Sequence, residues 1–297
     1  MAGFTQLSVR RERISAASDP AWVRGLVIFA SVAFVVLFLL LPMGTVFFEA
    51  FRRGVKPFLE PFGDPATRSA IGLTLLVAAI AVPLNTLGGV AAAWATCRFR
   101  FPGRGLLLAV IELPLWISPV VGGLVFMLIF GRQGWIGEWL IERDIRIMFA
   151  VPGIVLATVF VTFPFVARCV IPQMQAQGSA EEEAAMTLGA SGWRVFWKVT
   201  LPKVKWGLTY GIILCNARSM GEFGAVSVVS GHIRGRTNTM PLQVEILYNE
   251  YQFVAAFAVA SLLCALALVT LLVKAFSEWN LANALRLAGE SLPGGTS

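Results

Sequence analysis

Charged residues are scarce in this chain of 297 residues, and so are the side chains that most catalytic and metal sites require. Only 14% of the residues are charged, whereas 57% are hydrophobic, and His232 is the only histidine. It has no carboxylate or cysteine at ligand spacing, so a solvated surface residue explains it better than a catalyst or a metal ligand. The four cysteines include no Cys-x-x-Cys pair, which argues against a disulfide framework and against a metal site.

The sequence also lacks the motifs of the common nucleotide-binding and hydrolytic sites. It contains no GxxxxGK[ST] phosphate loop, no HExxH and no GxSxG, so no nucleophile with a paired base is predicted. The net charge of +7 comes from scattered basic residues without interleaved aromatic side chains, which argues against nucleic acid as a partner. We therefore expect a protein that is not an enzyme and that binds no metal or cofactor itself.

Long apolar runs take the place of a soluble core. A helix needs about 20 apolar residues to cross a bilayer, and backbone polar groups in lipid must be satisfied within helices. Six runs reach that length, at about 24–48, 69–94, 106–130, 149–171, 206–230 and 253–276. The predicted fold class is an all-α polytopic membrane protein with about six transmembrane helices.

The polar segments divide the chain into expected parts. Residues 1–23 should form a cytoplasmic arm, 24–48 the first transmembrane helix, 68–276 the core domain and 277–297 a cytoplasmic tail. Tryptophan and tyrosine favour membrane interfaces, and the tryptophans in 131–147 predict a short interfacial helix there. With both termini inside, the cytoplasmic segments hold more Lys and Arg than the outer ones, which favours an N-in and C-in topology.

A polar, helix-forming stretch, the coupling loop 178–202, separates the fourth and fifth runs. Ser179 followed three residues later by Glu182 predicts a capping box that starts a short helix near Ala180. Three successive glutamates then fall in the first turn, where the positive end of the helix dipole favours carboxylates. We expect this helix to lie near the membrane surface.

The end of this helix and its continuation are also predicted. Gly189 is the expected stop, because glycine adopts the left-handed conformation without a Cβ clash. Ser191 is the expected cap of a second short helix over 192–199. Pro202 should then prevent simple continuation of that second helix.

Two charges in the fifth run are candidates for a transport role. Arg218 and Glu222 stand four residues apart, which on a helix places them on one face within pairing reach. Charges inside a membrane segment are costly, so they should face the bundle interior or water. The pair is either an element of the pathway or gate, or a structural ion pair. Gly221 and Gly224 flank Glu222 and indicate a closely packed or locally broken backbone.

The third run contains one further charge. Glu112 lies near Pro114 and Pro119, which predict an irregular helix, and membranes tolerate such helices only where protein or water surrounds them. Glu112 either lines the pathway or has a packing role.

The coupling loop carries a resemblance to a known family. Glu183-Ala184-Ala185, Gly189 and Val199-Thr200-Leu201-Pro202 stand at the spacing of the EAA loop of ABC-importer permeases, with valine in place of the usual isoleucine. The resemblance implies a coupling helix that docks into a groove of a cytoplasmic ATPase. The implied coupling residues are Glu182, Glu183, Ala184, Ala185, Gly189, Leu201 and Pro202. An amphipathic helix resting on lipid headgroups is the alternative, but it explains none of the spacing.

A second motif narrows the resemblance. Residues 218–225 match the R-x-x-G-E-F-G-A pattern of sulfate and molybdate permeases, and the chain is similar to the W-type permease subunit of sulfate/thiosulfate importers over most of 24–276. The implied fold is that of type I ABC importer permeases (MetI-like). The length favours sulfate or thiosulfate, with molybdate or tungstate as the alternative. The implied pathway candidates are Arg218, Gly221, Glu222, Phe223 and Gly224, together with Glu112.

The resemblance also implies partners and a location. They are a T-type permease subunit, an ATPase homodimer that holds ATP and Mg²⁺, and a periplasmic sulfate/thiosulfate-binding protein, in the lipid of a bacterial inner membrane. An ion-coupled secondary carrier is the alternative from another class, but it would show paired internal repeats, and we find none. A membrane-embedded enzyme would need converging catalytic groups.

Overall fold

The computed structural model describes residues 20–290, with the side chains of residue 20 and of 22–276. Most of the expected N-terminal arm and the end of the expected tail lie outside the described residues. All regular elements within the described part are helices. The chain divides into two compact units, Met1–Phe48 and Glu49–Ser297.

The described part of the first unit is one long apolar helix. It comprises α1 (Ala21–Val35), a π-helical turn η1 (Val36–Leu40) and the beginning of α2 (Leu41–Phe51). The Leu41 N–H bonds to the carbonyl of Val36, one residue further back than in an α-helix. Because proline lacks an N–H and its ring crowds the preceding turn, this wider turn accommodates Pro42 without ending the helix.

The second unit begins with short helices that lead into a long span. They are α3 (Val55–Leu59) and the 3₁₀ turn η2 (Glu60–Gly63). The span α4 (Pro65–Arg98) follows, and Asp64 caps it by accepting a 3.1 Å hydrogen bond from the Thr67 N–H. A proline at the first helical turn is well tolerated, because its missing N–H would have had no partner there.

The third apolar run is not one straight helix, in line with the irregular helix that Pro114 and Pro119 predict. It forms α5 (Arg104–Trp116) and α6 (Pro119–Phe130), whose axes meet at 110°. Ile117 and Ser118 are extended, with ψ of 135° and 132°. The residue before a proline is disfavoured in the α-helical region, which explains a break directly before Pro119.

The fifth run is broken as well. It contains α11 (Leu201–Met220) and α12 (Gly224–Ser230), and the helix that includes α11 is bent from α12 by 50°. The break falls at Gly221–Phe223, so Arg218 and Glu222 do not share one continuous helix.

The remaining helices connect these spans. A short helix, α7 (Gly137–Glu142), forms where an interfacial helix was predicted, and α8 (Val151–Gln177) forms in the fourth run. α13 (Met240–Asn249) forms between the fifth and sixth runs, where no helix was predicted, and α14 (Phe253–Glu290) continues as a helix beyond 276, where the sixth run ends. Four helices in the described part are long and apolar enough to cross a membrane, or six if each bent pair counts as one span.

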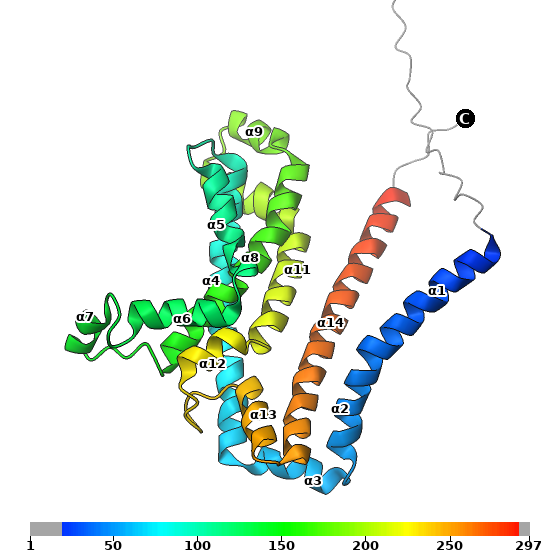
Figure 1. Cartoon of the computed structure of the whole chain (residues 1–297). Coiled ribbons are helices and arrows are strands. Elements are labelled where there is room, and N and C mark those ends of the chain that lie inside the picture. The colour runs from blue at the N-terminus through cyan, green and yellow to red at the C-terminus, as the bar shows by residue number, and fades with distance from the viewer. Residues whose placement is uncertain (1–19, 291–297) are drawn as a thin grey trace, which may run out of the picture. The chain divides into compact units, whose positions relative to one another are not determined.

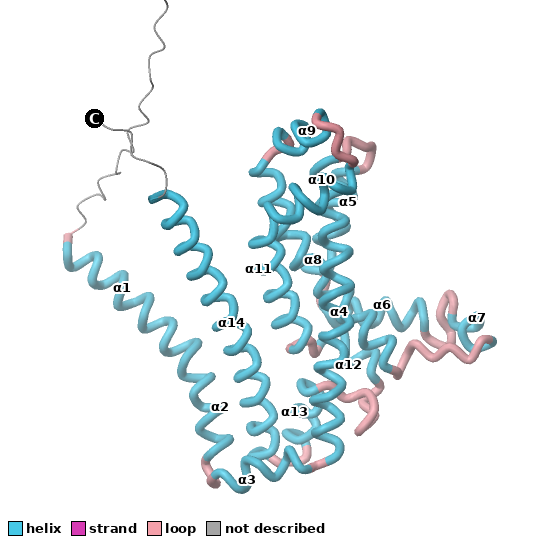
Figure 2. The backbone as a smooth tube through the Cα atoms, turned by 180° about the vertical axis from the view of Figure 1, so that it is seen from behind, coloured by secondary structure: helices cyan, strands magenta, loops and turns pink. Residues whose placement is uncertain are grey.

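The centre of the second unit is the packing of α4, α8 and α11, which run side by side (Figures 1 and 2). Asn85 of α4 donates a 2.7 Å hydrogen bond to the Thr162 hydroxyl of α8. The Ser219 hydroxyl of α11 lies 3.4 Å from the same oxygen. All three side chains are buried, so the three helices share one polar contact within an otherwise apolar interior.

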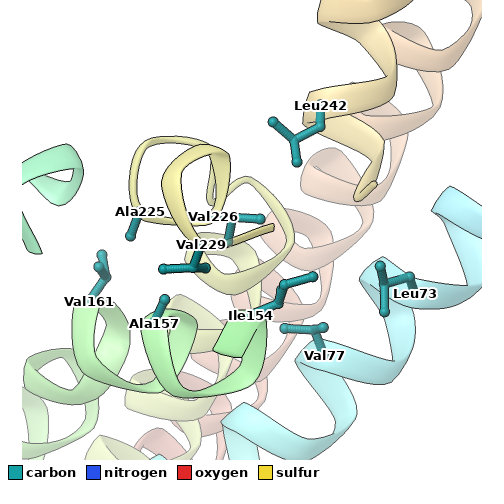
Figure 3. Close-up of a cluster of buried hydrophobic side chains, with 9 residues drawn as sticks. All are labelled: Leu73, Val77, Ile154, Ala157, Val161, Ala225, Val226, Val229 and Leu242. Atoms are coloured by element: carbon teal, nitrogen blue, oxygen red, sulfur yellow. The ribbon is translucent and has the colours of Figure 1, made fainter. Parts of the chain in front are cut away.

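A second group of buried side chains joins α12 and α13 to α4 and α8 (Figure 3). Its members are aliphatic: Leu73, Val77, Ile154, Ala157, Val161, Ala225, Val226, Val229 and Leu242. In Figure 3, Val229 of α12 lies beside Ala157 and Ile154 of α8. This packing fixes α12 at the end of the broken fifth run.

The close contact between α6 and α12 predicts that the stability of the fold depends strongly on one glycine, Gly123. A Cβ atom at Gly123 would lie 2.8 Å from the carbonyl oxygen of Ala225 and 2.9 Å from Val228 Cβ. We expect Gly123→Leu to destabilise the fold by about 1–3 kcal/mol through overpacking, measured as a lower thermal midpoint of the purified protein. Gly72→Leu is the matched control, because nothing lies within 4 Å of its Cβ position. Equal midpoints for the two variants would contradict this packing.

Candidate functional site

The coupling loop forms a helix, a left-handed turn and a second helix at one end of the second unit (Figure 1). The first helix is α9 (Ala180–Thr187), and Gly189 follows it with φ of +86°. The Gly189 N–H bonds to Met186 O at 2.9 Å, and the Ala190 N–H bonds to Ala185 O at 3.0 Å. This pair of bonds is a Schellman motif, which satisfies the last carbonyls of α9 and requires a left-handed residue at Gly189.

The helix starts at Ala180 as expected, but the predicted capping box is wrong. The Ser179 side chain makes no capping bond to a backbone N–H. Its hydroxyl instead donates a 2.6 Å hydrogen bond to the carboxylate of Glu183. Glu182, the expected partner of Ser179, is turned into the protein, where it is 6% exposed.

Glu182 is held by two side chains from other elements. Arg98, the last residue of α4, places Nε 2.5 Å from Oε2 and Nη2 2.7 Å from Oε1 of the carboxylate. The Thr200 hydroxyl donates a further 2.7 Å hydrogen bond to Oε1. The Nη2 hydrogen bond is charge-assisted and the Nε contact is an ion pair, so together they fix the orientation of the carboxylate as well as its distance.

The second helix does not end at Pro202, contrary to the expectation. α10 (Gly192–Val195) passes through the π-helical turn η3 (Phe196–Thr200) into α11, so the helix is continuous from Gly192 to Met220. The Leu201 N–H bonds to Phe196 O, again one residue further back than in an α-helix. The coupling loop is therefore joined to the fifth span by unbroken helix.

The outer surface of the coupling loop is apolar and exposed. Leu188 is 89% exposed and Trp193 is 66% exposed, while Met186 and Trp197 are half-exposed. Glu183 and Ala184 are exposed on α9 beside them, and Ala185 is partly covered. Leu201 is half-buried against the second core cluster, and Pro202 is exposed at the start of α11. Large apolar side chains gathered among charges are typical of a surface that binds another protein.

A hollow of about 630 Å³ lies between the coupling loop and the segment that joins α4 to α5. Arg98, Arg100 and Arg104 line one side, and Glu182 and Glu183 line another. Arg98 and Glu182 neutralise each other, which leaves Arg100 and Arg104 against Glu183, so the charged side chains that line the hollow carry a net charge of +1.

Arg218 and Glu222 form the ion pair that their spacing predicts, with Nη2 of Arg218 2.9 Å from Oε2 of Glu222. The Glu222 side chain is 1% exposed, whereas that of Arg218 is 36% exposed. Glu222 lies beyond the end of α11, and its Oε1 accepts a 3.0 Å hydrogen bond from the Ala225 N–H in the first turn of α12. Glu222 thus holds the broken ends of the fifth run together.

The other pathway candidates have different surroundings. Gly224 packs tightly on α6, since a Cβ atom there would lie 2.9 Å from Pro119 Cβ. Gly221 and Phe223 are exposed at the break. Glu112 is exposed on α5, a helix that packs against α8, and it is not part of the ion pair between Arg218 and Glu222.

Sequence reasoning missed Arg98 and Thr200. Arg98 was not among the residues predicted from the sequence, and Thr200 occupies the unspecified position between Val199 and Leu201 in the EAA pattern. The only signal available in the sequence was an arginine just after an apolar run together with a glutamate-rich loop elsewhere in the chain. This signal does not identify which glutamate the arginine binds.

Comparison with known proteins places this arrangement among transport proteins. Residues 85–280 match the family model described as binding-protein-dependent transport system inner membrane component. The sulfate transport system permease protein CysW of Synechocystis sp. is 53% identical over 256 residues, which cover 86% of this chain and 93% of that protein. The sulfate transport system permease protein CysT of Escherichia coli K12 is 38% identical over 241 residues, with 81% and 87% covered.

A solved structure agrees with the fold. The chain is similar to a subunit in the crystal structure of a bacterial ABC transporter that imports the polysaccharide alginate, with a TM-score of 0.72. The match covers 86% of this chain and 94% of that one, at 16% sequence identity. Similarity at this level of identity concerns the fold alone.

Proposed function

This chain belongs to the family of binding-protein-dependent transport system inner membrane components, and we infer that it is a sulfate permease subunit of an ABC importer. As a family member it is a multi-pass inner-membrane permease and not the ATPase of its system. The sulfate assignment is supported by the relatives of 53% and 38% identity, whose names both specify sulfate transport. The motif around Arg218 and Glu222 supports the same substrate class.

The observation that carries the mechanism is the exposed apolar surface of the coupling loop. Leu188 and Trp193 stand out from a helix pair whose turn geometry is fixed at Gly189. We propose that this surface docks on an ATPase homodimer, which binds ATP and Mg²⁺, while this chain binds neither. The coupling loop then lies in the cytoplasm, with N-in and C-in topology. Closure of the ATPase dimer on ATP would move α9, and α11 would move with it because the helix is continuous.

The remaining partners follow from the same proposal. A T-type permease subunit would complete the pathway, and a periplasmic sulfate/thiosulfate-binding protein would select the oxyanion. Glu112, exposed in the single chain, would face that second subunit or the aqueous pathway, because an ionised side chain in contact with lipid is costly. Arg218, Gly221, Glu222, Phe223 and Gly224 would lie where the fifth run breaks, at the side of the pathway.

The substrate is tested by uptake in proteoliposomes that contain this chain with its co-purifying subunits, supplied with the binding protein and internal ATP. We expect radiolabelled sulfate to accumulate only with ATP and binding protein, and unlabelled thiosulfate to compete with it. Molybdate at equal concentration should compete weakly. Preferential uptake of molybdate would overturn the sulfate assignment, and uptake without ATP, driven by an ion gradient, would overturn the ABC mechanism.

A further inference from the structure

We propose that the ion pair between Glu182 and Arg98 is a rigid joint that makes α9 and the cytoplasmic end of α4 move as one body during transport. The inference rests on the proposed function, because it requires α9 to be the helix that the ATPase moves. It assigns positioning roles to Arg98 and Thr200, and it gives Glu182 an internal role instead of a contact with the ATPase.

The geometry of the joint is specific. The guanidinium of Arg98 contacts both carboxylate oxygens of Glu182, at 2.5 Å and 2.7 Å. Nη2 also donates a 3.0 Å hydrogen bond to Gly178 O, two residues before α9 begins. The two side chains are only 14% and 7% exposed. Because the pair is shielded from solvent and salt, screening weakens it much less than it weakens a surface ion pair.

The covalent connection between α8 and α9 passes through a glycine, Gly178. α8 ends at Gln177, and the following Gly178 has φ of +65° and ψ of −169°, a conformation that glycine adopts readily and other residues avoid. Nothing lies within 4 Å of the Cβ position of Gly178. Without the ion pair, α9 would be free to turn about this glycine relative to α8.

The joint also reaches the fifth span. Thr200, which is buried in η3, donates its hydroxyl hydrogen to the same Glu182 carboxylate at 2.7 Å. Glu182 therefore connects α9 to the end of α4 and to the start of α11. Beyond the joint, α4 and α11 pack against α8, and Asn85 bonds to Thr162 in their common interior. A displacement of α9 is passed to these three helices together.

A neighbouring ion pair provides a matched control. Glu181 precedes Glu182 on α9 and lies 2.7 Å from Lys203 Nζ, but its side chain is 69% exposed. An exposed ion pair of this kind constrains the orientation of the helix only weakly and contributes little to the free energy of folding. Glu181→Gln should therefore leave coupling unchanged.

The test uses the full importer in proteoliposomes, with co-purified ATPase, ATP hydrolysis and sulfate uptake measured on the same samples. We expect Glu182→Gln and Arg98→Gln to retain the ATPase and its hydrolysis but to lower sulfate uptake per ATP by about tenfold, a typical coupling between two sites. Uptake per ATP in the double variant should be no lower than in either single variant, because each single substitution already removes the same ion pair. Unchanged uptake per ATP in Glu182→Gln would overturn the proposal.

A second measurement covers the case in which these variants lose the ATPase altogether. Spin labels on Thr187→Cys and Arg100→Cys, in the complex with its native cysteines replaced, report the distance between α9 and the end of α4. We expect one narrow distance that is the same in the resting and the ATP-trapped complex. A distance that changes between the two states would contradict a rigid joint. Failure of the native chain to retain any ATPase would instead contradict the proposed function itself.

Discussion

Gly189→Val is expected to reduce ATP-driven sulfate uptake at least tenfold while the chain still inserts and folds. The φ of +86° at this position excludes a β-branched residue, and left-handed backbone costs roughly 1–2 kcal/mol for residues with a Cβ atom. Nothing lies within 4 Å of the Cβ position, so the strain comes from the backbone and not from a clash. The chain can relieve it only by opening the Schellman turn, which changes the angle between α9 and α10. Uptake per ATP hydrolysed in proteoliposomes measures the effect.

Two variants in the same loop make this result specific. Gly189→Asn should retain most of the uptake, because asparagine accepts the left-handed conformation better than other residues with a Cβ atom. Gly192→Ala should be close to the native protein, since its position is helical and open. Native uptake in Gly189→Val, or an equal loss in Gly192→Ala, would show that the turn angle is not what couples the loop.

Arg218→Leu is expected to destabilise the protein by about 3 kcal/mol, the cost of leaving a buried charge without its partner. The Glu222 side chain is 1% exposed, so water does not replace the lost guanidinium. Glu222→Gln should cost much less, because the amide oxygen still accepts the hydrogen bond from the Ala225 N–H and no buried charge is left. The measurement is the thermal midpoint of the purified complex for the two variants.

The same pair of variants separates the two roles that the ion pair allows. A lower midpoint in Arg218→Leu, with uptake lost in proportion to the folded protein, assigns the pair to holding α11 and α12 together. If the Arg218→Leu complex is as stable as the Glu222→Gln complex but fails to transport sulfate, the structural prediction is contradicted and the pair is assigned to gating.

The sequence was sufficient for the membrane class, for most helices and for the turn at Gly189. These features depend on local chemistry: long apolar runs, and a glycine at the end of a short polar helix. The position and angle of the two breaks in the spans were harder to predict than an irregular backbone there, because prolines and glycines also occur in many continuous membrane helices. Pro83 lies inside α4 without ending it, whereas Pro119 starts a new helix after two extended residues.

The side-chain contacts of the coupling loop could not be predicted from local sequence patterns, because they join residues that are far apart in the chain. Ser179 and Glu182 fit a capping box by spacing, but Arg98 lies 84 positions from Glu182 in the chain and binds it more strongly than a backbone N–H would. α13 was missed for a similar reason. It is a short helix in a polar connection, and packing against α4 and α14 stabilises it instead of a long apolar run.

Site-specific photo-crosslinking from the two ends of the second unit tests the central claim most directly. A photoreactive residue at Leu188, in the coupling loop, is compared with one at Tyr251, which is 81% exposed at the turn between α13 and α14. In the intact importer, Leu188 should crosslink to the ATPase, and Tyr251 should give no ATPase adduct. Crosslinks to the ATPase from Tyr251 and none from Leu188 would contradict both the docking surface and the topology proposed for this permease.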